Sequence, residues 1–156
     1  MNGFFAMIYE LFLSLYGQNL GYYLFGFDCD FIVVNQSGYA FVGFWLIGIT
    51  IVVAALFYYA ISSPRFYRWY HWLIMLLINA GINFLVAYNF TTAALDAGKI
   101  PECFVTATDT GLIQIDNGSC IGFGLANVIV ASILFLIVSF TIRWWSKNAS
   151  TSPFPS

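Results

Sequence analysis

Apolar residues run through this chain in long blocks, and the polar positions gather between them. Three blocks contain no Asp, Glu, Lys or Arg: residues 39–61, 69–90 and 121–142. A helix of about 20 apolar residues is long enough to cross a hydrocarbon core of roughly 30 Å. The pattern therefore predicts transmembrane helices over these three ranges.

A fourth apolar block covers residues 3–27, but Glu10 lies inside it and the sequence "GQN" at Gly17–Asn19 interrupts it. It is not typical of a secretory signal, because no Lys or Arg precedes the apolar run and no small-residue cleavage site follows it. The block predicts either a kinked fourth span or an amphipathic helix in the membrane interface. We expect an all-α integral membrane protein, a single membrane domain over residues 1–156 with four spans, and three spans as the alternative.

The composition supports a membrane protein. Hydrophobic residues make up 61% of the chain and charged residues 8%, whereas a soluble domain has about 25% charged residues. No basic stripe is present to neutralise phosphates, so nucleic acid is not an expected partner. The expected partners are the lipid bilayer and either further copies of the chain or other membrane subunits.

The distribution of charge predicts the orientation, because Lys and Arg accumulate on the cytoplasmic side of membrane proteins. Arg65 and Arg68 lie between two predicted spans, and Arg143 and Lys147 lie in the tail at 143–156. Six of the seven acidic residues fall on the opposite face: Asp28, Asp30, Asp96, Glu102, Asp109 and Asp116. We therefore expect a cytoplasmic C-terminus in a bacterial inner or plasma membrane.

The extracytoplasmic loop, residues 91–120, has the pattern of a small β cap. Two segments with strand character, 104–108 and 112–116, flank the turn sequence "DTG". Pairing them places apolar side chains on one face and polar side chains on the other. A third strand at 27–34 would complete the cap, because an isolated two-stranded hairpin is only marginally stable.

Cys29, Cys103 and Cys120 all fall on the extracytoplasmic side, where an oxidising compartment permits a disulfide. Cys103 and Cys120 bracket the predicted hairpin and form the preferred pair. The alternatives are a bridge between Cys29 and Cys120, or three unpaired thiols.

Motifs for catalysis and cofactors are missing from the sequence. The chain has one histidine, and its cysteines do not form a Cys-x-x-Cys motif. It also has no Gly-x-Ser-x-Gly sequence and no phosphate-binding loop. We therefore expect no enzymatic activity, no cofactor and no metal site.

Glu10 is the acidic residue within a predicted span, and a carboxylate in a membrane is a candidate for a functional site. In a four-span protein it would lie near the cytoplasmic end, where it could line the axis of an oligomeric pore. It could instead pair with Arg65, Arg68 or His71, which the topology places at the same membrane face.

Three asparagines are the other polar candidates within the spans. Asn79 and Asn83 share a helix face, and Asn127 lies at a matching depth in the antiparallel last span. They predict either an interhelical hydrogen bond or a pore lining. Gly81, Gly122 and Gly124 would allow the helices to approach closely.

These features favour an oligomeric ion-conducting pore or pore-like membrane effector. The alternative is a membrane anchor or assembly subunit that binds a partner protein through its cytoplasmic hairpin and tail. Arg65, Arg68 and Trp69 would then contact the partner. His71 is the candidate for a pH-dependent switch, because an unperturbed histidine titrates near neutrality.

Overall fold

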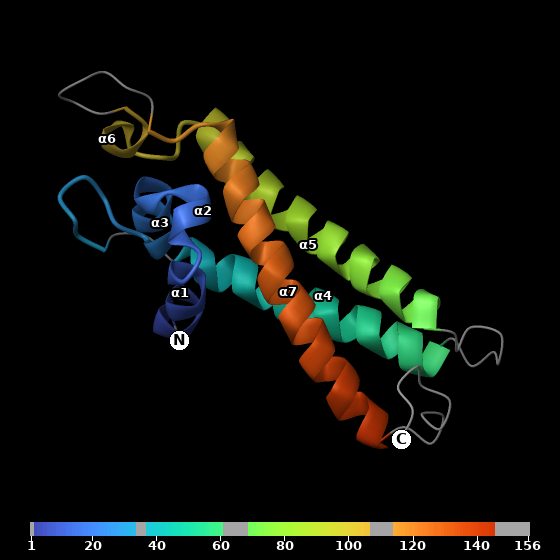
Figure 1. The fold of residues 1–156 in the computed structure, drawn as a ribbon. Coiled ribbons are helices and arrows are strands. Elements are labelled where there is room, and N and C mark those ends of the chain that lie inside the picture. Colours follow the sequence, from blue (N-terminus) through green and yellow to red (C-terminus); the bar gives the residue numbers. More distant parts are fainter. Residues whose placement is uncertain (1, 34–36, 61–68, 107–113, 146–156) are drawn as a thin grey trace.

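A computed structural model of the chain describes residues 2–33, 37–60, 69–106 and 114–145. Three long helices form its body (Figure 1): α4 (Gly38–Ala55), α5 (Trp69–Asp96) and α7 (Asn117–Trp145). A short π-helix, η1 (Leu56–Ala60), continues α4. The segments Gly38–Tyr58, Tyr70–Asp96 and Asn117–Ile142 are long and apolar enough to cross a membrane. Three helices long and apolar enough to cross a membrane therefore occupy the three charge-free ranges.

Two of these helices are longer than predicted at the end of the bundle where α4 and α7 begin and α5 ends, which we call the cap end. Helix α7 begins at Asn117 because Asp116 precedes it, and its carboxylate Oδ1 accepts a hydrogen bond from the Ser119 N–H at 2.9 Å. This bond also holds the pKa of Asp116 below its usual range. Helix α5 continues to Asp96, and Gly98 follows it with a φ of 62°, a value that glycine adopts without strain.

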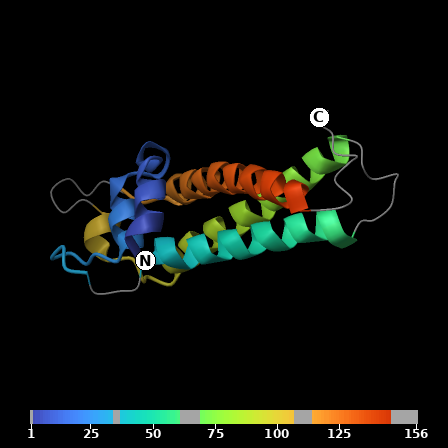
Figure 2. The same ribbon diagram turned by 90° about the horizontal axis from the view of Figure 1, so that it is seen from below.

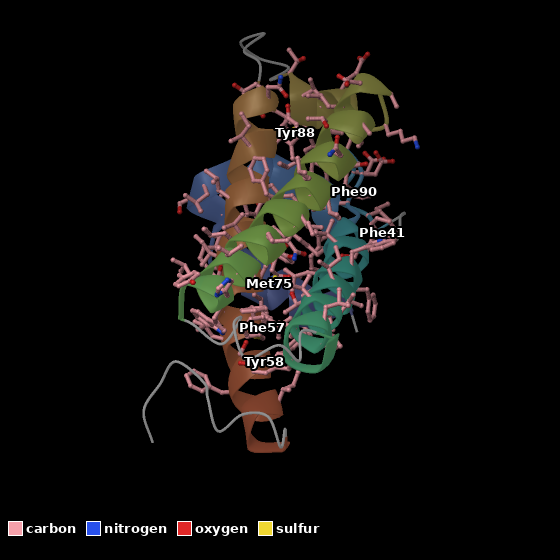
Figure 3. The ribbon with its side chains drawn as sticks, turned by 90° about the vertical axis from the view of Figure 1, so that its right-hand side faces the viewer. Phe41, Phe57, Tyr58, Met75, Tyr88 and Phe90 are labelled. Atoms are coloured by element: carbon pink, nitrogen blue, oxygen red, sulfur yellow. A yellow bond between two sulfur atoms is a disulfide. The ribbon has the colours of Figure 1, made fainter. Side chains whose placement is uncertain are left out.

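The three helices pack as one elongated bundle (Figure 2). Near the cap end the ring of Phe41 in α4 stacks on Phe90 in α5, with 5.1 Å between the ring centroids (Figure 3). Towards the opposite end, Val53, Ala54 and Phe135 form a second buried cluster. Helices α4, α5 and α7 thus pack through apolar contacts near both ends of the bundle.

The predicted fourth span is wrong. The N-terminal segment forms three short helices at the cap end (Figure 1): α1 (Asn2–Glu10), α2 (Leu13–Tyr16) and α3 (Gln18–Phe25). The longest, α1, has nine residues, which gives a length of about 14 Å at 1.5 Å per residue. Gly17 separates α2 from α3 with a φ of 85°. No helix in this segment can therefore span a bilayer.

The short helices pack closely on the side of the bundle. The Phe5 ring covers Gly43 of α4, where an added Cβ would lie 2.2 Å from the ring. At Gly122 of α7 an added Cβ would lie 2.0 Å from the backbone oxygen of Leu15. The glycines in α4 and α7 therefore determine where α1 and α2 can sit.

The predicted β cap is also wrong: the described residues of the cap contain no strand. Residues of the first predicted strand instead form a short helix, α6 (Glu102–Val105), which follows Pro101 with its φ of −55°. A backbone hydrogen bond joins described residues of the two predicted strands, from Gln114 N–H to Val105 O at 2.8 Å. The turn at 107–113 lies outside the described residues.

The predicted third strand, 27–34, closes on itself instead of joining a sheet. Phe27 and Val33 form an isolated bridge, and Asp28 N–H donates to Ile32 O at 3.0 Å. The cap is therefore built from helical turns and loops in the part of the chain that the structure describes.

The preferred disulfide pair is wrong as well. Cys29 is bonded to Cys103, with 5.9 Å between their Cα atoms, and Cys120 is a free, buried thiol. Cys120 lies in the first turn of α7 and faces the bundle interior, so it is not available to either partner. The bond joins the loop after α3 to α6 and thereby ties the N-terminal segment to the connection between α5 and α7.

Candidate functional site

A chain of buried hydrogen bonds crosses the bundle from α1 to α5. The Tyr9 hydroxyl donates to Asn127 Oδ1, and Asn127 Nδ2 donates to the backbone oxygen of Asn83 at 2.7 Å. Asn83 Nδ2 donates to Asn79 O at 2.9 Å, and Asn79 Nδ2 donates to Ala131 O at 3.3 Å. The interhelical bond expected from the matching depths of Asn83 and Asn127 is therefore present.

The three asparagines lie inside one subunit. Asn79, Asn83 and Asn127 are each 0% exposed, so none of them faces the perimeter of the bundle. Buried amides need hydrogen-bond partners, and the three Nδ2 groups have them, Asn83 within α5 and Asn79 and Asn127 across to the other helix. Asn83 Oδ1 has no partner among the described residues. The arrangement is that of interhelical hydrogen bonding rather than of a surface that could line an axis between subunits.

A cluster of tyrosines lies next to this chain of hydrogen bonds, and the sequence analysis did not identify it. The Tyr16 hydroxyl donates to Tyr9 O at 2.9 Å and lies 2.9 Å from the Tyr39 hydroxyl, which must then be the donor in that contact. Tyr9 and Tyr39 stack with 5.4 Å between ring centroids. The sequence did contain a signal for this cluster, because a tyrosine within an apolar run needs a hydrogen-bond partner for its hydroxyl when it is buried.

The tyrosine hydroxyls remain protonated over the ordinary pH range. Burial raises the pKa of Tyr16 to about 12, with a smaller contribution in the same direction from the carboxylate of Glu10 and an opposing one from the hydrogen bond with Tyr39. Burial also raises the pKa of Tyr9. The cluster therefore acts as a set of neutral hydrogen-bond donors that attaches α1 and α2 to the bundle.

Glu10 lies at the rim of a pocket of about 250 Å³ at the cap end. It is the last residue of α1, it is exposed, and it forms no ion pair within the described residues. The pocket, called the Glu10 pocket below, is lined by Glu10, Leu13, Gln18, Gly21, Tyr22, Phe25, Phe27 and Tyr39. It combines one carboxylate with four aromatic residues.

Glu10 and His71, a pair suggested from the sequence, lie in different parts of the structure. His71 lies in the first turn of α5, and α5 begins at the end of the bundle away from α1 (Figure 1), the helix that ends at Glu10. Its ring lies against Tyr70, with 4.1 Å between the centroids. Arg65 and Arg68, the other proposed partners of Glu10, lie outside the described residues, and nothing is described of the Trp69 side chain.

A second hollow is a groove of about 360 Å³ between α1, α4 and α7. Its lining is apolar and includes Phe4, Ile8, Leu46, Ile133 and Ile137. It opens beside α1, because that helix is too short to cover α4 and α7 along their length.

The structure shows no metal-binding group: the described residues contain no cluster of three or more His, Cys, Asp or Glu side chains. No protein family, curated protein or solved structure matches the chain. The function must therefore be inferred from the geometry itself.

Proposed function

We propose that this protein is a membrane assembly subunit whose helix α5 binds a transmembrane helix of a partner protein. The observation that carries this proposal is that the rest of the structure buries α5 less than it buries α4 or α7. Residues buried inside the structure make up 22% of the most apolar window in α5, against 39% in each of the other two spans. One side of α5 is therefore open to the membrane.

The open side of α5 has a shape suited to helix packing. Its exposed apolar residues are Leu73, Ile74, Leu77, Ile78, Ile82 and Leu85. Gly81 lies among them, and a Cβ added there would have no neighbour within 4 Å. Gly81 thus forms a notch between bulky side chains, and close approach at small residues is a common basis of helix association in membranes.

The pore predicted from the sequence has less support. An aqueous path between subunits needs polar or charged side chains along its lining. Asn79, Asn83 and Asn127 are buried within the subunit and bonded to its own helices. Glu10 lies in the short N-terminal segment, outside the three spans.

The same proposal includes an orientation. We place the C-terminus in the cytoplasm of a bacterial inner or plasma membrane, with the cap end outside. The charge distribution supports this, because in the sequence Arg65 and Arg68 fall between η1 and α5, and Arg143 and Lys147 fall at or after the end of α7. The cap-end disulfide also fits an oxidising compartment. Docking through the hairpin around Arg65 and Arg68 rests on the sequence alone.

The test compares two leucine substitutions at open glycines. Gly81→Leu fills the notch on α5, and Gly48→Leu makes the same change on α4, where an added Cβ also has no neighbour within 4 Å. Both variants should fold, because neither position is in contact with another part of the subunit. The complex is isolated from membranes of the native source in mild detergent, and its mass and composition are measured.

We expect the wild-type chain and Gly48→Leu to co-purify with a second membrane protein in a fixed ratio, and Gly81→Leu to lose it. A chain that purifies alone or only as a symmetric homo-oligomer would contradict the proposal. Equal retention of the partner by both variants would also contradict it, because α5 would then not be the contact.

A further inference from the structure

We propose that the Glu10 pocket binds an organic ammonium cation, either free in solution or as the headgroup of a lipid. This inference does not depend on the role of α5. It rests on the charge, the aromatic lining and the size of the pocket, together with its position at the cap end.

The charge of the pocket calls for a cation. Glu10 is the one charged residue in the lining, and no basic residue within the described part of the chain neutralises it. Further acidic residues lie on the same cap: Asp28, Asp30, Asp96, Glu102 and Asp116, against the single basic residue Lys99. Their summed potential attracts cations to this end of the molecule and repels anions.

The aromatic lining selects an organic cation over a metal ion. Four aromatic residues line the pocket: Tyr22, Phe25, Phe27 and Tyr39. Tyr39 is buried and stacks on Tyr9, and Phe25 stacks on Phe27, whereas the Tyr22 ring is exposed. The faces of aromatic rings attract ammonium groups. A divalent metal needs several oxygen or nitrogen ligands. Glu10 is the one acidic residue in the lining, and Gln18 and the tyrosine hydroxyls beside it are neutral, so the lining offers a metal ion a single anionic ligand.

The size of the pocket restricts the ligand to a small group. Its volume of about 250 Å³ is below the roughly 300–1,000 Å³ of pockets that enclose drug-sized molecules. Gly21 in the wall packs tightly on its neighbours, because an added Cβ would lie 2.6 Å from Leu13 Cδ2 and 3.2 Å from the Tyr39 hydroxyl. A trimethylammonium or primary ammonium group fits these dimensions.

The position of the pocket makes a lipid headgroup one possible source of the cation. The pocket lies beside the first turn of α4, where the apolar span begins, and two exposed apolar residues, Met7 of α1 and Leu11 just after it, are close in sequence to Glu10. A headgroup bound there would leave its acyl chains beside the bundle. A free ammonium ion would enter from the aqueous side of the cap.

The experiment titrates the full-length protein, in a non-ionic detergent, with tetramethylammonium chloride, and sodium chloride at equal ionic strength is the reference. Binding is measured by calorimetry. Glu10→Gln removes the charge and keeps the shape of the side chain. Glu102→Gln makes the same change at an exposed residue of α6 outside the pocket and is the matched control.

We expect Glu10→Gln to weaken tetramethylammonium binding about tenfold, since it removes the paired charge, and Glu102→Gln to leave the affinity unchanged. A second variant, Tyr22→Leu, should weaken binding about threefold, because it removes an aromatic face but no charge. Lack of binding by the wild-type protein would overturn the proposal. An equal loss in the two glutamine variants would also overturn it, because binding would then reflect only the general charge of the cap.

A second arm identifies the source of the cation. The protein is reconstituted in nanodiscs that contain equal amounts of phosphatidylcholine and phosphatidylglycerol. It is then released from the nanodiscs, and the lipids that stay bound to it are measured by native mass spectrometry. Enrichment of phosphatidylcholine that is lost in Glu10→Gln supports a lipid headgroup as the ligand. Tetramethylammonium binding without lipid enrichment supports a free ammonium ion.

Discussion

Individual polar residues in this protein stabilise helix contacts inside an apolar bundle. The Tyr9 hydroxyl is an example, because it joins α1 to Asn127 of α7. Asn127 in turn donates to the backbone of Asn83 in α5. A hydrogen bond between membrane helices contributes about 0.6–2 kcal/mol, so each of these residues has a measurable effect on stability.

The first prediction concerns Tyr9→Phe. The change keeps the buried ring and removes the donor to Asn127, so we expect it to lower the free energy of unfolding by about 1–2 kcal/mol. Tyr70→Phe, at a residue that is 41% exposed, is the control and should have little effect. Reversible unfolding in mixed micelles gives both values, and an equal effect of the two changes would mean that the Tyr9 hydroxyl bond contributes nothing.

The short helices hold their positions through close backbone contacts. Helix α2 lies against α7 at Gly122, and its neighbour α1 lies against α4 at Gly43. The sequence suggested that Gly81, Gly122 and Gly124 would all allow close approach. Gly122 and Gly124 do so, towards Leu15 and Phe84, whereas Gly81 has open space beside it.

The second prediction concerns Gly122→Ala. The new Cβ would lie 2.0 Å from the backbone oxygen of Leu15, so α2 must move, and we expect a loss of about 1–3 kcal/mol in the free energy of unfolding. Gly48→Ala adds the same methyl group to α4 in open space and should be neutral or slightly stabilising. Limited proteolysis should also cut the N-terminal segment faster in Gly122→Ala alone. If both variants behave alike, α2 does not pack on Gly122.

At the scale of the whole molecule, the cap is one unit tied together by a covalent bond. Cys29 and Cys103 are 74 residues apart in sequence, and their disulfide joins the N-terminal segment to the connection between α5 and α7. Asn19 also donates from α3 to Gln114, just before α7. These links allow three short helices to remain attached to a bundle that they do not cross.

The third prediction concerns the pairing of the cysteines. Peptide mapping without reduction should find Cys29 joined to Cys103 in the wild-type chain and in Cys120→Ser, and no such peptide in Cys29→Ser. Loss of the bond should lower stability by about 2–4 kcal/mol, as is typical of native disulfides. A Cys103–Cys120 peptide in the wild-type protein would contradict the structure.

The sequence by itself determined the three spans, because length and unbroken apolar character are local properties of a segment. It also predicted the depth match between Asn83 and Asn127, since the rise per residue of a helix is fixed. Both follow from residues that are close together in the chain, and the bilayer imposes the same requirement on each span.

Only the tertiary structure decided the form of the N-terminal segment, the cap and the disulfide. Apolar residues 3–27 satisfy the composition of a span, but the break at Gly17 and the contact of Leu15 with Gly122 place them beside the bundle. Alternation in the loop satisfies the pattern of a hairpin, yet the first predicted strand begins inside a helix, because Phe104 and Val105 belong to α6. Each outcome depends on contacts between residues far apart in sequence, which local patterns do not encode.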